Sequence, residues 1–171
     1  MSKLSYEFYH RPCLEVARDL VGKVLVHGEL RLRITETEAY CGESDTACHA
    51  SRGKTPRTEV MYRQAGTIYV YLCYGIHWML NIVTGEENEP EAVLIRACEG
   101  KFGGPGKLTK ALGITGSLNQ ESILGEELWI EDDGFRCPVT TDKRVGIGYA
   151  SGEDQERLWR FRMQEKNAVK I

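Results

Sequence analysis

Two stretches of the chain combine acids and aromatic rings in a way that suits chemistry on a flat ring system. Residues 35–40 (TETEAY) are expected to form a strand that ends in the carboxylate of Glu38 and the phenol of Tyr40. Residues 66–75 (GTIYVYLCYG) are expected to form a tyrosine-rich strand that runs into a turn. An acid beside aromatic faces can hold an unstacked nucleic-acid base and do chemistry next to it. The residue types therefore point to chemistry at a nucleotide.

The spacing in the first stretch places two acids on one side of the strand. Residues of equal parity share a strand face, so the even-numbered residues from Ile34 to Tyr40 are expected together. Glu36 and Glu38 would then lie about 7 Å apart, a separation that also occurs between paired carboxylates in glycoside hydrolysis. The alternative is that both acids are solvated, or are paired with the two arginines that precede them on the strand.

The second stretch places tyrosines together in the same way. Tyr69 and Tyr71 share a strand face, and Tyr74 follows at the turn before Gly75. Because tyrosine is common in half-buried strands, cross-strand packing is the alternative to a role in binding. His49 is open to the same two interpretations, a structural hydrogen bond or a place in a site.

The elements that must position these groups are mainly strands. Helical spacing occurs at residues 14–20, and residues 104–112 form a second helix with proline near its start. Strands are predicted at 24–26, 30–34, 66–74, 76–84, 92–98, 127–131, 143–147 and 157–162. Consecutive strands with few helices favour an antiparallel sheet over a doubly wound parallel one. We therefore expect an α+β fold, a single domain over residues 1–171 with a curved, mainly antiparallel, open-barrel-like β-sheet flanked by short helices.

The composition is that of an ordinary globular protein. Hydrophobic residues make up 42% of the 171 residues and charged residues 27%, which excludes a disordered chain. No run approaches the roughly 18 apolar residues of a membrane span, and the N-terminus lacks a signal-peptide core. We therefore expect a cytoplasmic protein without membrane contact, associated with the nucleoid if the cell is prokaryotic. The six cysteines, scattered without a C-x-x-C pair, predict free and mostly buried thiols.

The charge is distributed unevenly along the chain. A net charge of −3 argues weakly against nucleic acid, because phosphate neutralisation needs lysine and arginine. However, residues 52–63 contain four basic residues and only one acidic residue, Glu59. A surface with one basic face is compatible with this pattern, and a solvated mixture of charges is the alternative.

Two further motifs do not support the sites that they suggest. Cys41, Cys48 and His49 lack the spacing and the fourth ligand of a zinc site, so no metal is predicted. Gly106-Lys107 does not match a phosphate loop, because the flanking positions of that pattern are wrong. This segment fits better as a helix N-terminus whose free N–H groups and nearby lysines meet a DNA phosphate.

Eight short motifs follow one another along almost the whole chain, from about residue 14 to residue 161. They are residues 36–40 (ETEAY), 45–49 (DTACH), 54–57 (KTPR), the tyrosine strand, 80–82 (LNI), 93–97 (VLIRA), 104–108 (GPGKL) and 144–148 (RVGIG). In this order and at these spacings the chain resembles the alkyladenine (3-methyladenine) DNA glycosylase family. These are monofunctional base-excision enzymes that remove alkylated and deaminated purines.

The resemblance implies catalytic roles for particular residues. Glu38 would be the general base that activates the attacking water. Arg96 and the backbone carbonyl of Val145 would help to hold that water.

The resemblance also implies how the substrate would be held. The flipped purine would lie between Tyr40 on one side and His49 and Tyr71 on the other, with a backbone hydrogen bond donated by His49. Asn81 would exclude normal guanine by crowding its 2-amino group. Tyr74 would intercalate into the gap left in the duplex. The DNA backbone would be contacted by Arg57, Lys107 and Lys110.

The resemblance sets the expected reaction and partners. The substrates would be 3-methyladenine, 7-methylguanine, hypoxanthine and ethenoadenine in double-stranded DNA, and the product an abasic site. Base flipping costs a few kcal/mol, and stacking returns roughly 1–3 kcal/mol per base, more for a cationic ring on a tyrosine face. The family needs no cofactor, and a monomer is expected.

Two other classes remain open on the residues alone. A carbohydrate-active hydrolase could use Glu36 and Glu38 as an acid and base pair, although only Trp78 is near in sequence to serve as a sugar platform. A non-catalytic nucleic-acid-binding module could use the tyrosines for stacking and leave Glu38 idle.

Overall fold

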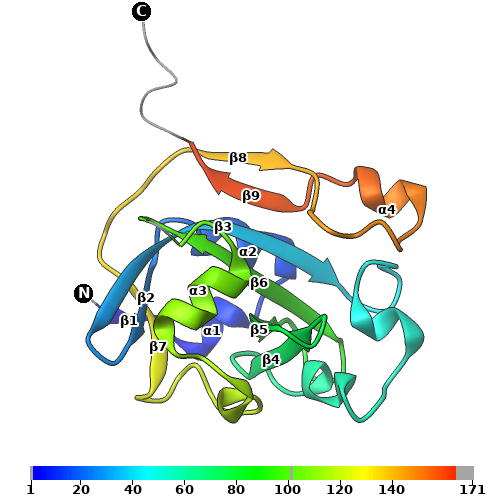
Figure 1. The fold of residues 1–171 in the computed structure, drawn as a ribbon, viewed down its shortest axis with the longest axis horizontal. Helices are drawn as coiled ribbons and strands as arrows, with labels where there is room; N and C mark the ends of the chain where they lie inside the picture. Colours follow the sequence, from blue (N-terminus) through cyan, green and yellow to red (C-terminus); the bar gives the residue numbers. More distant parts are fainter. Residues whose placement is uncertain (1, 101, 165–171) are drawn as a thin grey trace, which may run out of the picture.

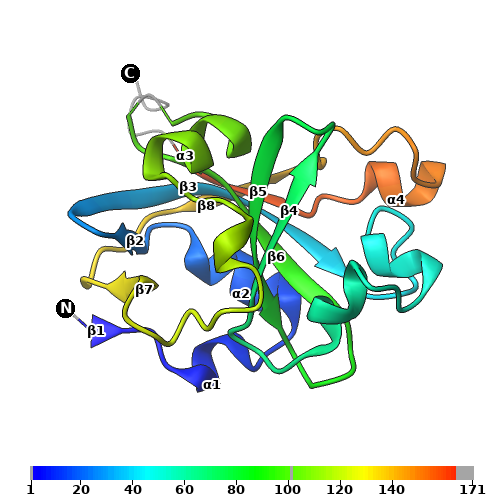
Figure 2. The same ribbon diagram turned by 60° about the horizontal axis from the view of Figure 1, so that its bottom comes forward.

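The fold is a curled antiparallel sheet with short helices packed on it (Figures 1 and 2). The computed structural model describes residues 2–100 and 102–164. Along the main path of the sheet the strand order is β1-β7-β2-β3-β6-β5-β4, and β9 pairs with both β3 and β8. Every strand pair in the described residues is antiparallel. The predicted α+β class with a curved, mainly antiparallel sheet is therefore confirmed.

The elements have the following bounds. The strands are β1 (Ser2–Lys3), β2 (Val24–His27), β3 (Leu30–Cys41), β4 (Ile68–Cys73), β5 (His77–Thr84), β6 (Glu91–Cys98), β7 (Leu128–Asp132), β8 (Val139–Asp142) and β9 (Arg160–Met163). The helices are α1 (Tyr6–Tyr9), α2 (Cys13–Leu20), α3 (Pro105–Leu112) and α4 (Gly152–Glu156), with the 3-10 turns η1 (His49–Arg52), η2 (Thr58–Tyr62) and η3 (Gly116–Leu118). No helix among the described residues has both the length and the apolar character that crossing a bilayer requires.

Successive side chains along β3, β6, β5 and β4 point to opposite faces of the sheet, which gives the sheet a core face and a second face. On the core face, Ala39, Val93, Leu80 and Ile68 pack in one apolar cluster that includes the buried sides of α2 and α3. The intervening residues of the same strands point the other way. They are Glu38 and Tyr40 on β3, Leu94 and Arg96 on β6, Asn81 on β5, and Tyr69 and Tyr71 on β4. The second face therefore collects the predicted site residues from four strands.

A bulge in β3 changes one predicted orientation. Ile34 was expected on the face of Glu36 and Glu38, but it lies in the main core with Ala39. The pairing of β3 with β6 shifts register twice, between Ile34 and Glu36 and between Glu36 and Thr37. A bulge opposes two residues to one, so the parity of the strand changes across it. Residues 36, 38 and 40 keep the predicted common direction.

The last part of the described chain departs from the predicted strands. Residues 143–147 form a loop, and the strand lies earlier, as β8. Arg144 is drawn into a buried ion pair, and Gly146 takes a φ of 75°, which a strand interior does not adopt. The last predicted strand begins at Arg160 rather than at residue 157. The short helices α1 and α4 were not predicted.

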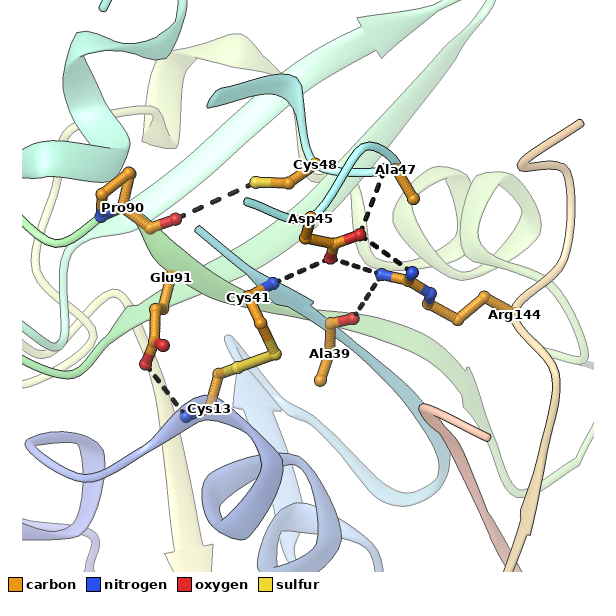
Figure 3. The surroundings of a disulfide bond; sticks show 9 residues. All are labelled: Cys13, Ala39, Cys41, Asp45, Ala47, Cys48, Pro90, Glu91 and Arg144. Atoms are coloured by element: carbon orange, nitrogen blue, oxygen red, sulfur yellow. Dashed lines mark hydrogen bonds and ion pairs between the residues drawn. A yellow bond between two sulfur atoms is a disulfide. The ribbon is translucent and has the colours of Figure 1, made fainter. Parts of the chain in front are cut away.

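The prediction of free cysteines was wrong for one pair. Cys13 at the start of α2 and Cys41 at the end of β3 form a disulfide, with their Cα atoms 6.3 Å apart (Figure 3). The two residues are 28 positions apart, and packing of α2 on β3 brings them together. Cys48, Cys73, Cys98 and Cys137 are free, and only Cys48 and Cys98 among them are fully buried.

Candidate active site

Glu38 is a fully buried carboxylate held on both of its oxygens. Its side chain has no exposed surface. The Tyr40 hydroxyl donates a hydrogen bond to Oε1 at 2.9 Å, and the Val145 amide N–H donates to Oε2 at 2.7 Å. Arg96 Nη1 lies 4.0 Å from Oε2. The structure thus brings Glu38, Arg96 and Val145 together, and their catalytic roles stay predictions. The predicted contact of the Val145 carbonyl with a water stays a prediction, since the N–H is the group that contacts Glu38.

Burial dominates the acid–base behaviour of this carboxylate. Loss of solvent raises the pKa of Glu38 above its ordinary value of 4.5. The Val145 N–H, the Arg96 charge and the Tyr40 hydroxyl each stabilise the ionised form and oppose this rise in pKa. A carboxylate with a raised pKa is a better proton acceptor than an ordinary surface acid.

Glu36 lies on the same side of β3 but has different partners. Its carboxylate accepts from Arg160 at 3.4 Å and Arg162 at 3.2 Å, and Arg96 Nε lies 3.6 Å away. Arg96 therefore bridges the two acids, with one nitrogen near each. Three guanidinium groups hold Glu36 as an ion-pair partner, whereas Glu38 is the acid that is hydrogen-bonded to a residue of the aromatic cluster, Tyr40.

The aromatic residues line a small cavity on the second face of the sheet. Its volume is about 30 Å³, and its walls include four predicted pocket residues, Tyr40, His49, Tyr71 and Asn81. The His49 and Tyr71 rings meet edge to face, with centroids 4.5 Å apart. The other lining residues are Ala47, Cys48, Met61, Tyr69, Ala92 and Tyr149. Tyr40 lines the cavity, and its hydroxyl is hydrogen-bonded to Glu38, so this one residue contacts both the cavity and the carboxylate.

His49 opens the turn η1 and carries no charge at neutral pH. Burial and the nearby charges of Arg57 and Arg52 lower its pKa to about 4. Its Nδ1 lies 3.2 Å from the hydroxyl of Tyr69, at hydrogen-bonding distance. A neutral imidazole among tyrosines offers a flat, weakly polar surface to a base.

Asn81 is fixed by backbone contacts within the sheet. Its amide nitrogen donates to the carbonyls of Tyr69 at 3.2 Å and Met79 at 3.3 Å. Both N–H groups are engaged, so the carbonyl oxygen is the group that Asn81 can offer to the cavity.

Tyr74 lies at the tip of the hairpin that joins β4 and β5, with 87% of its surface exposed. Its φ is 52° and that of Gly75 is 67°, and the Ile76 N–H donates to the Cys73 carbonyl at 3.1 Å. Both φ values lie in the left-handed region, which glycine and asparagine adopt more readily than a bulky residue. A bulky exposed tyrosine there is strained, and such strain concentrates at functional sites.

The residues predicted to contact DNA phosphates lie near this hairpin. Arg57 donates to the Leu72 carbonyl on β4 at 3.3 Å, and its guanidinium lies 5.0 Å from the Tyr71 ring centroid. Lys107 and Lys110 are exposed on α3, which packs on β5. The contacts of these three residues with DNA stay predictions.

Several residues of the site have no predicted role. Tyr149 borders the cavity with 61% of its surface exposed, and its hydroxyl donates to the Ala47 carbonyl at 2.7 Å. Asp45 and Arg144 form a buried ion pair beside Tyr40. Asp45 and Arg144 each begin a motif that carries the family resemblance, at residues 45–49 and 144–148. This resemblance was the only feature of the sequence that could have indicated a role for them.

The described residues contain no group of three or more His, Cys, Asp or Glu side chains arranged to hold a metal ion. The polar groups that line the cavity are tyrosine hydroxyls, an imidazole and an amide. The chemistry that these residues can carry out themselves is acid–base chemistry at Glu38.

Comparison with known proteins gives the same assignment from several sources. Residues 7–167 match the family model described as methylpurine-DNA glycosylase. A protein of Methanocella arvoryzae with the provisional name 3-methyladenine DNA glycosylase is 46% identical, over 94% of this chain and 92% of its own. A protein of Desulfitobacterium hafniense with the same name is 42% identical over the full length of both chains. One of Anaeromyxobacter dehalogenans is 48% identical, over 95% of this chain and 84% of its own. With a buried carboxylate beside an aromatic cavity and matches that span nearly all of its length, the chain belongs to the methylpurine-DNA glycosylase family.

Proposed function

We propose that this DNA glycosylase, a hydrolase of N-glycosyl bonds, excises alkylated and deaminated purines with a water activated by Glu38. The expected substrates are 3-methyladenine, 7-methylguanine, hypoxanthine and ethenoadenine in double-stranded DNA, bound by one copy of the chain. The observation that carries the proposal is that Tyr40 both lines the aromatic cavity and is hydrogen-bonded to Glu38.

Reaching the glycosidic bond requires that the nucleotide leave the helix. Unstacking costs a few kcal/mol, and stacking on aromatic side chains returns roughly 1–3 kcal/mol per base. The faces of Tyr40 and Tyr71 supply this surface, and the exposed Tyr74 fills the gap in the duplex. A cationic alkylated purine gains further from the electron-rich faces of the tyrosine rings.

The cavity must widen when a base enters. A volume of about 30 Å³ suits water-sized guests, so a purine has to displace part of the wall. Tyr149 is the most exposed lining residue, and one hydrogen bond to Ala47 holds its hydroxyl. We propose that the Tyr149 side chain moves aside while the sheet residues stay in place.

In the hydrolytic step, the water oxygen attacks C1′ as the bond to the purine nitrogen breaks. The bonding electrons leave with the base, and one proton of the water passes to Glu38. Each carboxylate oxygen has two acceptor positions, so Glu38 can take this proton while it keeps the bonds from Tyr40 and Val145. Arg96, near Oε2, stabilises the ionised carboxylate before the step.

The test is release of free base from a duplex that contains one hypoxanthine, followed by alkaline cleavage at the abasic site. A glycosylase yields free hypoxanthine and an alkali-labile strand. A binding module retards the duplex without cleavage, and a carbohydrate hydrolase does neither. Absence of base release from every lesion named above would refute the proposal. The carbohydrate alternative has little support, because three arginines occupy its second acid, Glu36.

A further inference from the structure

We propose that the buried ion pair between Asp45 and Arg144 is the positioning device of the active site. It holds the loop that carries Val145 against the strand that carries Glu38 and Tyr40. The proposal rests on the function proposed above and adds two residues that act through others.

The pair is buried, and several hydrogen bonds join it to its surroundings (Figure 3), although the Nε of Arg144 has no hydrogen-bond partner among the described residues. The exposed fractions of the two side chains are 0% for Arg144 and 1% for Asp45. Arg144 Nη1 donates to Asp45 Oδ2 at 2.6 Å, and Nη2 donates to Oδ1 at 3.0 Å. This two-pronged geometry fixes the guanidinium plane as well as its position.

Each partner also binds backbone from a different segment. Arg144 donates to the carbonyls of Ala39 on β3 at 3.0 Å and Asp154 on α4 at 3.3 Å. Asp45 accepts from the amides of Cys41 at 2.9 Å and Ala47 at 3.1 Å. The pair therefore joins the end of β3, the loop that leads to His49 and the segment from residue 143 to α4. Figures 1 and 2 show the last two segments side by side.

Two active-site contacts depend directly on this junction. Val145 follows Arg144 in the chain, so the position of Arg144 sets where the Val145 N–H meets Glu38. The guanidinium carbon also lies 5.1 Å from the centroid of the Tyr40 ring. Arg144 is not among the residues that line the cavity, so it can support the Tyr40 ring without contributing to the cavity wall.

A contribution to the stability of the fold does not by itself explain why a buried ion pair is present at this position. Burying two charges costs several kcal/mol per ion, and apolar residues of similar volume often stabilise a fold equally well. Apolar residues would not fix the direction of the Val145 N–H or the plane of Tyr40. Misplacement of reacting groups by about 1 Å can slow an enzyme on the order of a hundredfold.

The pair should also influence the pH dependence of the reaction. The charged and titratable groups that face Glu38 are Tyr40 from its own strand, Arg96 from β6, Arg160 from β9, and Arg144 and Tyr149 from the loop. The hydrogen bond from the Val145 N–H favours the ionised form of Glu38. Loosening the loop weakens this bond and therefore raises the pKa of Glu38 further. The acid limb of the excision rate should then move to higher pH.

The test compares two charge-neutral double variants. Asp45→Asn with Arg144→Met removes the pair without leaving a buried charge. Arg33→Met with Asp133→Asn is the matched control, because it removes a two-pronged ion pair at the other end of β3. For each folded variant the measurements are the dissociation constant for hypoxanthine duplex, the single-turnover excision rate and its pH profile.

We expect the first variant to excise about 10- to 100-fold more slowly, with a smaller change in the dissociation constant and an acid limb at higher pH. The control should match the wild type in rate and acid limb. A folded first variant with the wild-type rate, or with a slower rate and an unmoved acid limb, would overturn the proposal. If the double variant does not fold, Arg144→Lys is measured and judged by the same criteria. Lysine keeps the positive charge but cannot make the two-pronged contact with Asp45. Absence of excision by the wild type would instead count against the proposed function.

Discussion

Substitution of Glu38 by glutamine tests the centre of the proposed chemistry with little change in shape. The glutamine oxygen can accept from the Val145 N–H, which lies 2.7 Å from Oε2 in the wild type. Its amide nitrogen can donate to the Tyr40 oxygen, whose hydroxyl can rotate to accept. The cavity and the stacking surfaces are thus kept, whereas the negative charge beside Arg96 and the ability to take a proton are lost.

The expected effect on rate follows from the role of a general base. Such a group contributes about 10²- to 10⁴-fold to a rate, which corresponds to about 2.7–5.4 kcal/mol of activation free energy. Binding of the lesion duplex should change little, because no contact to the base is removed. The loss should therefore appear in the excision step alone.

The assay is single-turnover excision of hypoxanthine with enzyme in excess, alongside the dissociation constant for the same duplex. Glu36→Gln is the matched control, since it removes a carboxylate from the same strand face that binds arginines and does not contact Tyr40. It should lower the rate far less than Glu38→Gln. Retention by Glu38→Gln of more than about a tenth of the wild-type rate would refute the general-base assignment.

The same substitution should raise stability at neutral pH. Burial raises the pKa of Glu38 in the folded protein, whereas in the unfolded chain the group titrates near 4.5. The unfolded chain therefore releases this proton first as pH rises, which destabilises the fold above the unfolded pKa, fully so above the folded pKa. Glu38→Gln removes this penalty. Its melting temperature should exceed that of the wild type at about pH 8, and the difference should shrink towards about pH 4.

Three further predictions concern other parts of the molecule. Tyr74→Ala should lower the flipped population of an ethenoadenine base, measured by its fluorescence, with the chemical step intact; an unchanged equilibrium would remove Tyr74 from the site. Excision of cationic 7-methylguanine should show only a rising acid limb from Glu38, whereas neutral hypoxanthine should also slow at high pH, because its departure benefits from a proton; identical profiles in single-turnover assays would exclude leaving-group protonation. Cys13→Ser should cost about 3–4 kcal/mol of unfolding free energy in denaturant titrations of oxidised protein, from loss of a loop closed over 28 positions; with excess reductant the difference should largely vanish, and an equal loss in both conditions would assign it to packing.

The sequence alone determined the fold class and the neighbourhood of the site. Strand signals that follow one another with few helices between them can be recognised locally, so the class of sheet followed from them. Period-two alternation along residues 34–40 gave the common direction of Glu36 and Glu38. The order and spacing of the motifs then indicated the family. Candidate roles for Glu38, Arg96 and Tyr71 came from that resemblance, because no local pattern relates residues on different strands.

The tertiary structure decided which neighbours each group has. Ile34 turned to the other face because register shifts arise from pairing with β6, and pairing is not encoded in one strand. Cys13 and Cys41 met because α2 packs on β3, although their spacing in the chain gave no sign of it. The predicted strand at residues 143–147 became a loop because Arg144 binds Asp45, 99 positions away. Burial and long-range charge also set the raised pKa of Glu38, and both arise only when distant segments exclude water from the same place.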